Sequence, residues 1–373
     1  MKKWTDPQTQ RTVRQLTEFQ DGARLGYFRL PRHVPGGRVL IHGCGTDAGL
    51  YTLDVESAEC RRLQLPPGAG YLKLYSRSGK LWLLSHRDLW AVELPGGKPE
   101  LVVRVPAEAP GAIADVTCDG RTLILLERHQ DLEHYPVPTT PDPEKFWHYF
   151  SRPRTGRIWA FDIPSGRLTK LVETEGVTPD HIDCSPEDPG LVRYCLDMYD
   201  AYGQRIWAVR TDGSGQRMIR PQERGEFVTH EFWLGNSDLI GYTYQDRRRD
   251  PTLHEKPWGE YSPCPTHLGF ASTEGKERWL SGPLNCYHTH IFVSPDGRWV
   301  CGEGTDGHSF VYAAPFSFQE RHIEMVALAA VHAPYVPFRG QMVDAGFSAD
   351  SKWLLFNDTV DGRLQVCACA VPG

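Results

Sequence analysis

Short apolar runs that follow polar turns recur along the chain. Each run begins at a cluster of Asp, Gly or Ser residues that reverses the chain, and it continues as an apolar strand. Seven such units are present: PGGRVLIHG from Pro35, RSGKLWLLS from Arg77, CDGRTLILLE from Cys118, SPEDPGLVRYCLD from Ser185, LGNSDLIGYTY from Leu234, SPDGRWVCGEG from Ser294 and SADSKWLLFND from Ser348. The pattern predicts seven copies of one β unit.

Most units continue as an alternating strand, a polar turn and another strand, as in LWAVELPGGKPELVV and RIWAVRTDGSGQRMI. Each unit therefore reads as a four-stranded antiparallel sheet. The units start 42, 41, 67, 49, 60 and 54 residues apart, which fits propeller blades of roughly 40–50 residues with insertions. Because separate blades would expose apolar faces and edges, we predict that residues 1–373 form a single all-β domain, a seven-bladed β-propeller.

The two ends of the chain predict how the ring closes. The last unit ends at LQVCACAVPG, and TVRQLT, residues 12 to 17, is an early strand without a unit of its own. We predict that this N-terminal strand joins the C-terminal blade. Residues 129 to 156, with a short helix in DPEKFWHYF, and the polar residues 245 to 266 are long insertions, where we expect functional residues.

Composition excludes several classes of protein. The 11 Trp, 15 Tyr, 15 Phe, 36 Gly and 29 Pro residues suit short aromatic strands and many turns. A net charge of -6 gives no general electrostatic reason to bind nucleic acid or a membrane. With neither a signal-like apolar stretch nor a membrane-spanning run, we expect a cytoplasmic protein. The cysteines form no C-x-x-C pair, and Cys367 and Cys369 share one strand face, which favours core packing.

One segment has the letters of a nucleotide-binding motif. GCGTDA, residues 43 to 48, matches the dinucleotide fingerprint by letter, but that motif needs a helix to begin at its end. The following LYTLDVESAECRRL alternates like a strand, so a nucleotide site is not favoured. A serine hydrolase is not favoured either, because there is no G-x-S-x-G motif.

Several residues that bind metals or carry protons fall just before the turn of a unit, where inner strands approach the propeller axis. They are His181 in TPDHIDCSPED, His230 in THEFW, His288 and His290 in YHTHIFVSPDG, and Asp344 in QMVDAGFSAD. The alternative is that these histidines merely satisfy buried carbonyl groups. A shared central site and this structural role both remain open.

At these residues the chain resembles the oligogalacturonate lyase family. The strongest element is THEFW at 229 to 233, supported by YF at 27 to 28 before the GG turn, EKF at 144 to 146 and RIWAVRTDGS at 205 to 214. Members of that family are seven-bladed propellers that act in the cytoplasm on short pectin fragments. They hold a divalent cation, usually taken to be manganese, that binds the substrate carboxylate.

The resemblance implies a role for individual residues. It implies His230 as the base and Arg205 as the partner of substrate charge. We also predict Tyr27, His181 and Arg248 as substrate contacts, Arg248 because it lies in the basic run Arg247 to Arg249. The resemblance implies His290 as a metal ligand, with Gln341, Asp344 and His288 completing the site. The family has a His-Pro-His segment in the last blade, and here the corresponding stretch is GQMVDAGFS, with no histidine.

The leading prediction is therefore a lyase that cleaves an anionic uronate oligosaccharide by metal-assisted β-elimination. Removal of the proton next to a uronate carboxylate builds negative charge, which a cation and a guanidinium can stabilise. One alternative is a non-catalytic sugar-binding or scaffold propeller that has lost the metal site. Another is a related enzyme with changed chemistry on a different glycoside.

Overall fold

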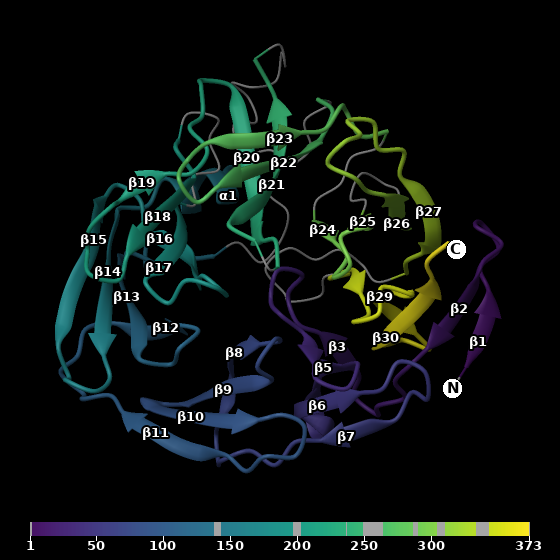
Figure 1. Ribbon diagram of the computed structural model, residues 1–373, viewed down its shortest axis with the longest axis horizontal. Helices are drawn as coiled ribbons and strands as arrows, with labels where there is room; N and C mark the ends of the chain where they lie inside the picture. The colour runs from purple at the N-terminus through teal and green to yellow at the C-terminus, as the bar shows by residue number, and fades with distance from the viewer. Residues whose placement is uncertain are drawn as a thin grey trace.

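Seven antiparallel sheets stand side by side in a ring in the computed structural model of the chain (Figure 1). In each sheet the strands run from the centre of the ring outward in chain order, except that the N-terminal strands β2 and β1 form the outer edge of the sheet that contains β28, β29 and β30. This arrangement confirms the predicted seven-bladed β-propeller. The structure describes residues 2–137, 143–196, 203–235, 237–248, 264–285, 290–303, 310–332 and 343–372.

The blades are numbered here in chain order, starting from the first sheet after the N-terminal strands. Blade 1 contains β3 (Ala23–Leu25), β4 (His33–Val34), β5 (Arg38–Gly43), β6 (Gly49–Leu53) and β7 (Cys60–Arg62). Blade 2 contains β8 (Gly70–Tyr75), β9 (Lys80–Ser85), β10 (Asp88–Glu93) and β11 (Glu100–Arg104). Blade 3 contains β12 (Ala112–Val116), β13 (Thr122–Gln130), β14 (Arg154–Asp162) and β15 (Leu168–Glu175).

The remaining blades follow the same order. Blade 4 contains β16 (Pro179–Cys184), β17 (Leu191–Leu196), β18 (Ile206–Arg210) and β19 (Arg217–Met218). Blade 5 contains β20 (Glu226–Trp233), β21 (Leu239–Asp246), β22 (His267–Ser272) and β23 (Glu277–Leu280). Blade 6 contains β24 (Ile291–Val293), β25 (Trp299–Glu303), β26 (Phe310–Pro315) and β27 (Val326–Ala330). Blade 7 contains β28 (Gly346–Phe347), β29 (Trp353–Val360), β30 (Arg363–Ala370), β2 (Thr12–Gln15) and β1 (Lys3–Thr5).

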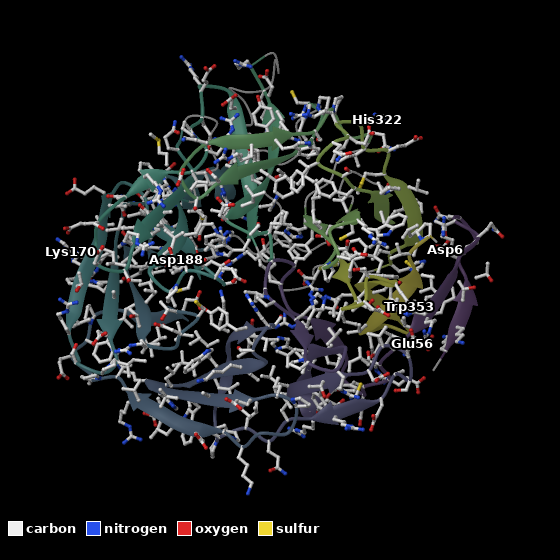
Figure 2. The ribbon with its side chains drawn as sticks, viewed as in Figure 1. Asp6, Glu56, Lys170, Asp188, His322 and Trp353 are labelled. Atoms are coloured by element: carbon white, nitrogen blue, oxygen red, sulfur yellow. The ribbon has the colours of Figure 1, made fainter. Side chains whose placement is uncertain are left out.

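The ring closes through the two ends of the chain. Strand β2 pairs antiparallel with β30, with Arg14 opposite Ala368, so the N-terminal strand completes the C-terminal blade as predicted. Side chains reinforce the closure on both sides of blade 7 (Figure 2). The carboxylate of Asp6 accepts a hydrogen bond from the Ala330 amide, and the Trp353 indole donates to Glu56 over 2.6 Å.

The turn between the first two strands of a blade is held by its own side chains. In blade 6 the Ser294 hydroxyl donates to the Asp296 carboxylate and accepts a 3.0 Å hydrogen bond from the Trp299 amide. Gly297 supplies the positive φ of 71° that the turn needs. Blades 3 and 7 repeat these side-chain contacts. The repeated letters of the sequence thus encode one self-supporting turn.

These turns define one side of the ring, called here the turn side. The opposite side, where the second and third strands of each blade connect, is called the loop side. Both predicted insertions belong to the loop side, and the first of them contains α1 (Pro143–Phe150) as expected. In the described part of the chain, no helix is long and apolar enough to cross a bilayer.

Apolar side chains pack between neighbouring blades. Cys367 and Cys369 are fully buried against Leu328 and Phe356 between blades 6 and 7, as their predicted core role requires. The GCGTDA segment forms a single 3-10 turn, η1 (Gly45–Asp47), and continues directly into β6. Without a helix at its end, this segment does not form a dinucleotide site.

Candidate functional site

The innermost strands of blades 4 and 5 are bulged at their histidines. The register of β16 shifts between Asp180 and Asp183, around His181, and that of β20 shifts between Thr229 and Phe232, around His230. The two histidines have φ values of 45° and 52° in the left-handed region, which non-glycine residues rarely adopt. Bulges re-aim side chains and are common beside functional sites.

Asp344 shares this backbone conformation in blade 7, with φ of 49°. His181, His290 and Asp344 each precede the turn serine of their blade by four residues, and His230 precedes Leu234 by the same number. The equivalent depth predicted for these four positions is therefore found in the structure. All four lie on the innermost strand or directly before it.

A segment of blade 1 reaches the centre of the ring and meets these residues. After β3 the chain turns inward before it returns to β5 (Figure 1); residues 26–32 are called the strap below. The Phe28 ring stacks on the His290 imidazole with centroids 4.2 Å apart, and its amide donates to Asp344 over 3.1 Å. The Tyr27 hydroxyl lies 3.4 Å from Nε2 of His290. The strap thus joins blade 1 to ligand candidates of blades 6 and 7.

Two of the imidazoles are held by carboxylates. Nδ1 of His181 lies 2.9 Å from Oε1 of Glu231, and Nδ1 of His290 contacts Oε1 of Glu303. A carboxylate can only accept, so in each neutral ring Nδ1 carries the proton. The lone pair of each ring is then on Nε2.

The third imidazole is held by a neutral partner. Nδ1 of His230 lies 3.3 Å from the Thr243 hydroxyl, and that hydroxyl donates to the carbonyl oxygen of Thr229 over 3.0 Å. Since the single hydroxyl hydrogen is committed to the carbonyl, Thr243 accepts from Nδ1–H of His230. The lone pair of His230 is therefore also on Nε2.

A buried carboxylate connects blade 4 to blade 5. Glu231 is fully buried and contacts three partners, namely Arg205 at 2.9 Å, Arg193 at 3.2 Å and His181. Burial raises the pKa of Glu231, but Arg205 and the hydrogen bond from His181 outweigh it and hold the pKa well below its usual value. Glu231 is therefore ionised at neutral pH, and it fixes the Arg205 guanidinium in place.

Burial also sets the charge of the neighbouring groups. It lowers the pKa of His230 well below 6.5, and the positive charges of His290 and Arg205 lower it further. Burial raises the pKa of Asp344 to about 7, and the nearby Glu303 carboxylate adds to this shift. At neutral pH, His230 is an uncharged base, whereas Asp344 is close to the midpoint of its titration.

The structure brings most of the expected residues together. His230 and His290 are in ring contact with centroids 4.8 Å apart, and Tyr27 lies within 6.2 Å of the His181 ring. Arg205 is close enough to affect the pKa of His230. These residues and Asp344 are called the central group below.

The other expected residues are placed elsewhere or fall outside the description. Arg248 lies at the surface beyond the end of β21, ion-paired with Asp246 at 2.6 Å and with Glu223 at 3.0 Å. The predicted ligands Gln341 and His288 lie outside the described residues. Arg248 thus lies on the loop side of the ring.

The residues that hold the central group were not predicted, although the chain carries a signal for them. In blades 5, 6 and 7 the partner lies on the second strand, thirteen residues after the inner residue: Thr243 after His230, Glu303 after His290 and Asn357 after Asp344. The hairpin turn between the strands has a constant length, so the spacing is constant. The same offset applied to the sequence would have found all three.

A second cluster has the spacing of metal ligands. Single ligand atoms of His181, Cys195 and Glu231 lie within 4.8 Å of one another. Glu231 already carries the guanidinium groups of Arg193 and Arg205. A cation there would face two like charges, so this cluster suits a proton relay or an anchor for Arg205 better than a metal.

Comparison with known proteins gives one consistent result. The oligogalacturonate lyase of Dickeya dadantii is 23% identical over 402 residues, which cover 99% of this chain and 95% of the relative. The oligogalacturonide lyase of Pectobacterium atrosepticum is 21% identical with the same coverage. The chain is similar to oligogalacturonate lyases over its whole length. No model of a known protein family matches the sequence.

Solved structures of oligogalacturonate lyases share the fold. One, described as a complex with manganese, has a TM-score of 0.74 at 22% identity and covers 100% of this chain and 96% of that one. Another, from Vibrio parahaemolyticus, has a TM-score of 0.75 at 21% identity with equal coverage. The similarity predicted from THEFW and the shorter motifs is confirmed, and the propeller of oligogalacturonate lyases is the fold of this chain.

Proposed function

We propose that the protein is an oligogalacturonate-lyase-like enzyme that cleaves uronate oligosaccharides by metal-assisted β-elimination. The observation that carries the proposal is the pair His230 and His290, which lie in ring contact but are held by different partners. A neutral partner leaves His230 uncharged, as a base requires. An anionic partner makes His290 a better electron donor, as a metal ligand requires.

His230 takes the proton at C5 of the uronate in this proposal. Thr243 holds the Nδ1 proton, so the lone pair that removes the substrate proton is on Nε2. The lowered pKa keeps the imidazole unprotonated at neutral pH. A positioned base of this kind typically contributes a rate factor of about 10²–10⁴.

Arg205 stabilises the negative charge that develops on the uronate carboxylate. Its guanidinium is nearly fully buried and is oriented by Glu231. Because the group is already fixed and desolvated, it requires little reorganisation when charge develops on the substrate.

Tyr27 and His181, at the edge of the central group, contact the sugar. Arg248 attracts the anionic chain from the loop side.

A divalent cation, first of all Mn²⁺, fits the donors of the central group. His290 offers Nε2 while Glu303 orients its ring, and Asp344 offers a carboxylate; we propose Gln341 and His288 as further ligands. Burial and, after it, the nearby Glu303 carboxylate raise the pKa of Asp344, and a cation would offset the repulsion between the two carboxylates. Nitrogen and oxygen donors suit manganese. When bound, the cation supplies a positive charge that polarises the substrate carboxylate.

A binding protein without activity is the second candidate. Asp344 stands where the resemblance implies histidine, and its pKa of about 7 leaves part of the carboxyl protonated and weakly ligating at neutral pH. In either case we expect a cytoplasmic protein that acts on anionic sugars of pectin rather than on nucleic acid or membranes.

The test is a lyase assay with oligogalacturonate and Mn²⁺. β-Elimination produces a conjugated double bond, so ultraviolet absorbance should rise with time. His230→Gln should lower kcat by about 10²–10⁴-fold, and His322→Gln, an exposed histidine of the outer surface, should not. If oligogalacturonate binds but the absorbance does not rise, the second candidate, a binding protein without activity, replaces the lyase proposal. A His230→Gln variant as active as the parent would remove His230 as the base.

A further inference from the structure

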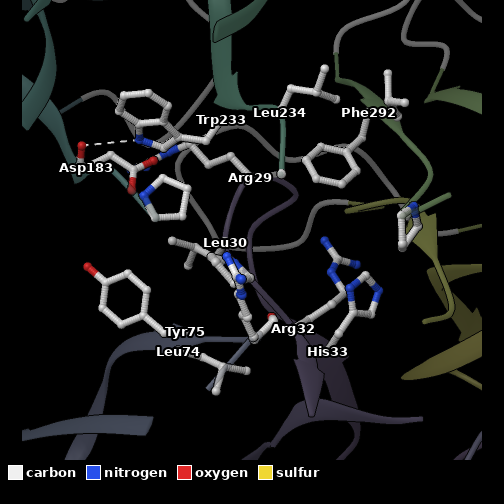
Figure 3. Close-up of a pocket in the computed structure, with 18 of the residues that line it drawn as sticks. Arg29, Leu30, Arg32, His33, Leu74, Tyr75, Asp183, Trp233, Leu234 and Phe292 are labelled. Carbon is white, nitrogen blue, oxygen red and sulfur yellow. Dashed lines mark hydrogen bonds and ion pairs between the residues drawn. The ribbon is translucent and has the colours of Figure 1, made fainter. Parts of the chain in front are cut away.

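A cavity of about 910 Å³ lies at the turn side of the ring. Its wall is formed by the strap and by the turns of blades 2, 4, 5 and 6 (Figure 3). The volume is at the upper end of the range of about 300–1,000 Å³ for small-molecule sites. The cavity is therefore large enough for an organic molecule of one or more rings.

The cavity is separate from the central group. Among the described residues, its lining includes Phe28 but not His181, His230 or His290. Phe28 stacks on His290 and so stands between the two spaces. The long insertions belong to the loop side, whereas this cavity opens among the short turns of the other side. A ligand bound here would not occupy the proposed lyase site.

Apolar and aromatic side chains make one part of the wall. Figure 3 shows Leu30 from the strap, Trp233 at the end of β20 and Phe292 of β24 around the same space. The Trp233 indole is held by a 3.3 Å hydrogen bond to the carbonyl oxygen of Asp183. Such rigid aromatic faces suit the apolar side of a ring-shaped ligand.

Two strap guanidinium groups have hydrogen-bond donors to spare. Each guanidinium has five N–H donors. In the described part of the chain, Arg29 donates one hydrogen bond, from Nη1 to Asp183 over 3.2 Å, and its buried Nε has no partner. Arg32 is 6% exposed and donates three hydrogen bonds, all to carbonyl oxygens of Gly26, Phe28 and Asp344.

Among the described residues, Arg32 thus makes no direct ion pair, although the carboxylates of Asp344 and Glu303 lie near enough to act on its charge. Buried charges are normally paired, because removing an ion from water without compensation is costly. Arg32 and Arg29 both line the cavity. The missing counter-charge can be supplied by a ligand.

The carboxylate of Asp183 in the cavity wall is contacted by cations, so it does not repel a bound anion. Asp183 is contacted by three cations, Lys73, Arg193 at 2.6 Å and Arg29 at 3.2 Å. Lys73 also contacts Asp115 at 3.0 Å. The described lining of the cavity has four cationic side chains, Arg29, Arg32, Lys73 and Arg77, and three carboxylates, Asp183, Glu187 and Asp296, so positive charge is in excess by one.

We propose that this cavity binds a small organic carboxylate, such as a sugar acid. Its carboxylate accepts hydrogen bonds from the unused donors of Arg29 and Arg32, and its ring packs on Trp233 and Leu30. The site does not depend on lyase activity. It would give the protein a second anion site on the opposite side of the ring.

The test is calorimetric titration of the full chain with galacturonate. Galactose is the neutral counterpart, and inorganic phosphate is a second anion. Arg29→Met should weaken galacturonate binding by about tenfold or more, because it removes charge-assisted hydrogen bonds. Galactose should bind more weakly than galacturonate. Equal affinity for the two sugars would overturn the proposal, and so would binding of phosphate without binding of galacturonate.

A second variant fills the cavity without touching the buried charges. A Cβ atom added at Gly235, on the cavity wall, would meet no atom within 4 Å, so we expect Gly235→Trp to fold and to block the space. Gly70→Trp is the matched control, because Gly70 is equally open but lies elsewhere. Binding should be lost in Gly235→Trp and kept in Gly70→Trp and in His290→Ala. Loss in His290→Ala with retention in Gly235→Trp would assign the binding to the central group instead.

Discussion

At the scale of single residues, the partner of each Nδ1 decides what its imidazole can do. His181 and His290 face carboxylates and His230 faces a hydroxyl, yet all three have the lone pair on Nε2. An anionic partner strengthens a ligand and raises the pKa of a base. A hydroxyl fixes the ring without raising its pKa. Thr243 is therefore a positioning residue for the proposed base.

Thr243→Val should lower kcat and leave KM nearly unchanged. Valine keeps the shape but cannot accept the Nδ1 proton, so the other tautomer of His230 becomes accessible. We expect a loss of about tenfold, equivalent to about 1.4 kcal/mol of transition-state stabilisation. Thr243→Ser restores the acceptor and should restore kcat. Equal losses in both variants would point to packing rather than to the tautomer.

Glu303→Gln should weaken manganese binding by about 10–100-fold, the usual effect of removing the group behind a ligating histidine. An amide no longer supplies the negative charge that makes Nε2 of His290 a strong donor. Calorimetry with MnCl₂ measures the change, and Glu320→Gln at the exposed surface serves as control. If Glu303→Gln binds manganese as tightly as the parent, His290 is not a ligand of the metal.

At the scale of elements, the bulged inner strands explain why the sequence located part of the site. The offset from the turn is local, so His181, His230, His290 and Asp344 could be aligned from the chain alone. The contacts of Glu231 with Arg193 and Arg205 could not, because they join different strands of two blades. The strap was also missed, since its role depends on packing against distant blades.

The charge cluster between blades gives an acid-sensitive element. Burial raises the pKa of Asp183, but Lys73, Arg193 and Arg29 outweigh it and hold the pKa below its usual value. Its stabilisation is complete above the unfolded pKa of about 3.9 and is lost as pH falls through the lower folded pKa. Asp183→Asn should destabilise the fold by about 3–5 kcal/mol at neutral pH.

Urea unfolding across pH measures this prediction. The gap between the parent and Asp183→Asn should be constant near neutrality and should shrink below about pH 4, where Asp183 becomes protonated in the unfolded parent while it is still ionised in the folded parent. Burial raises the pKa of the neighbouring Asp115. If the difference in stability between the parent and Asp183→Asn does not change with pH, the destabilisation comes from altered packing and not from the lost charge.

At the scale of the whole molecule, the sequence predicted the ring because its turn is repeated and self-supporting. Closure was predictable as well, since TVRQLT had no unit of its own. We propose that residues 1–373 unfold as one unit, because the terminal strands share blade 7.

Leu16→Ala tests this closure. Leu16 follows β2, is 2% exposed and packs in the core beside blade 7, so its truncation should cost about 2–5 kcal/mol. Leu101→Ala, at a position 46% exposed on the outer strand β11, should change stability by less than about 0.5 kcal/mol. Denaturant unfolding should remain a single transition in both. Two separate transitions would contradict a single unfolding unit.

The strap has a consequence for biosynthesis. Phe28 is synthesised well before Asp344, which accepts its amide hydrogen bond. The two are separated by 316 positions, so their contact is among the slowest kind to form. The contact between the strap and blade 7 can thus form only after Asp344 has been synthesised.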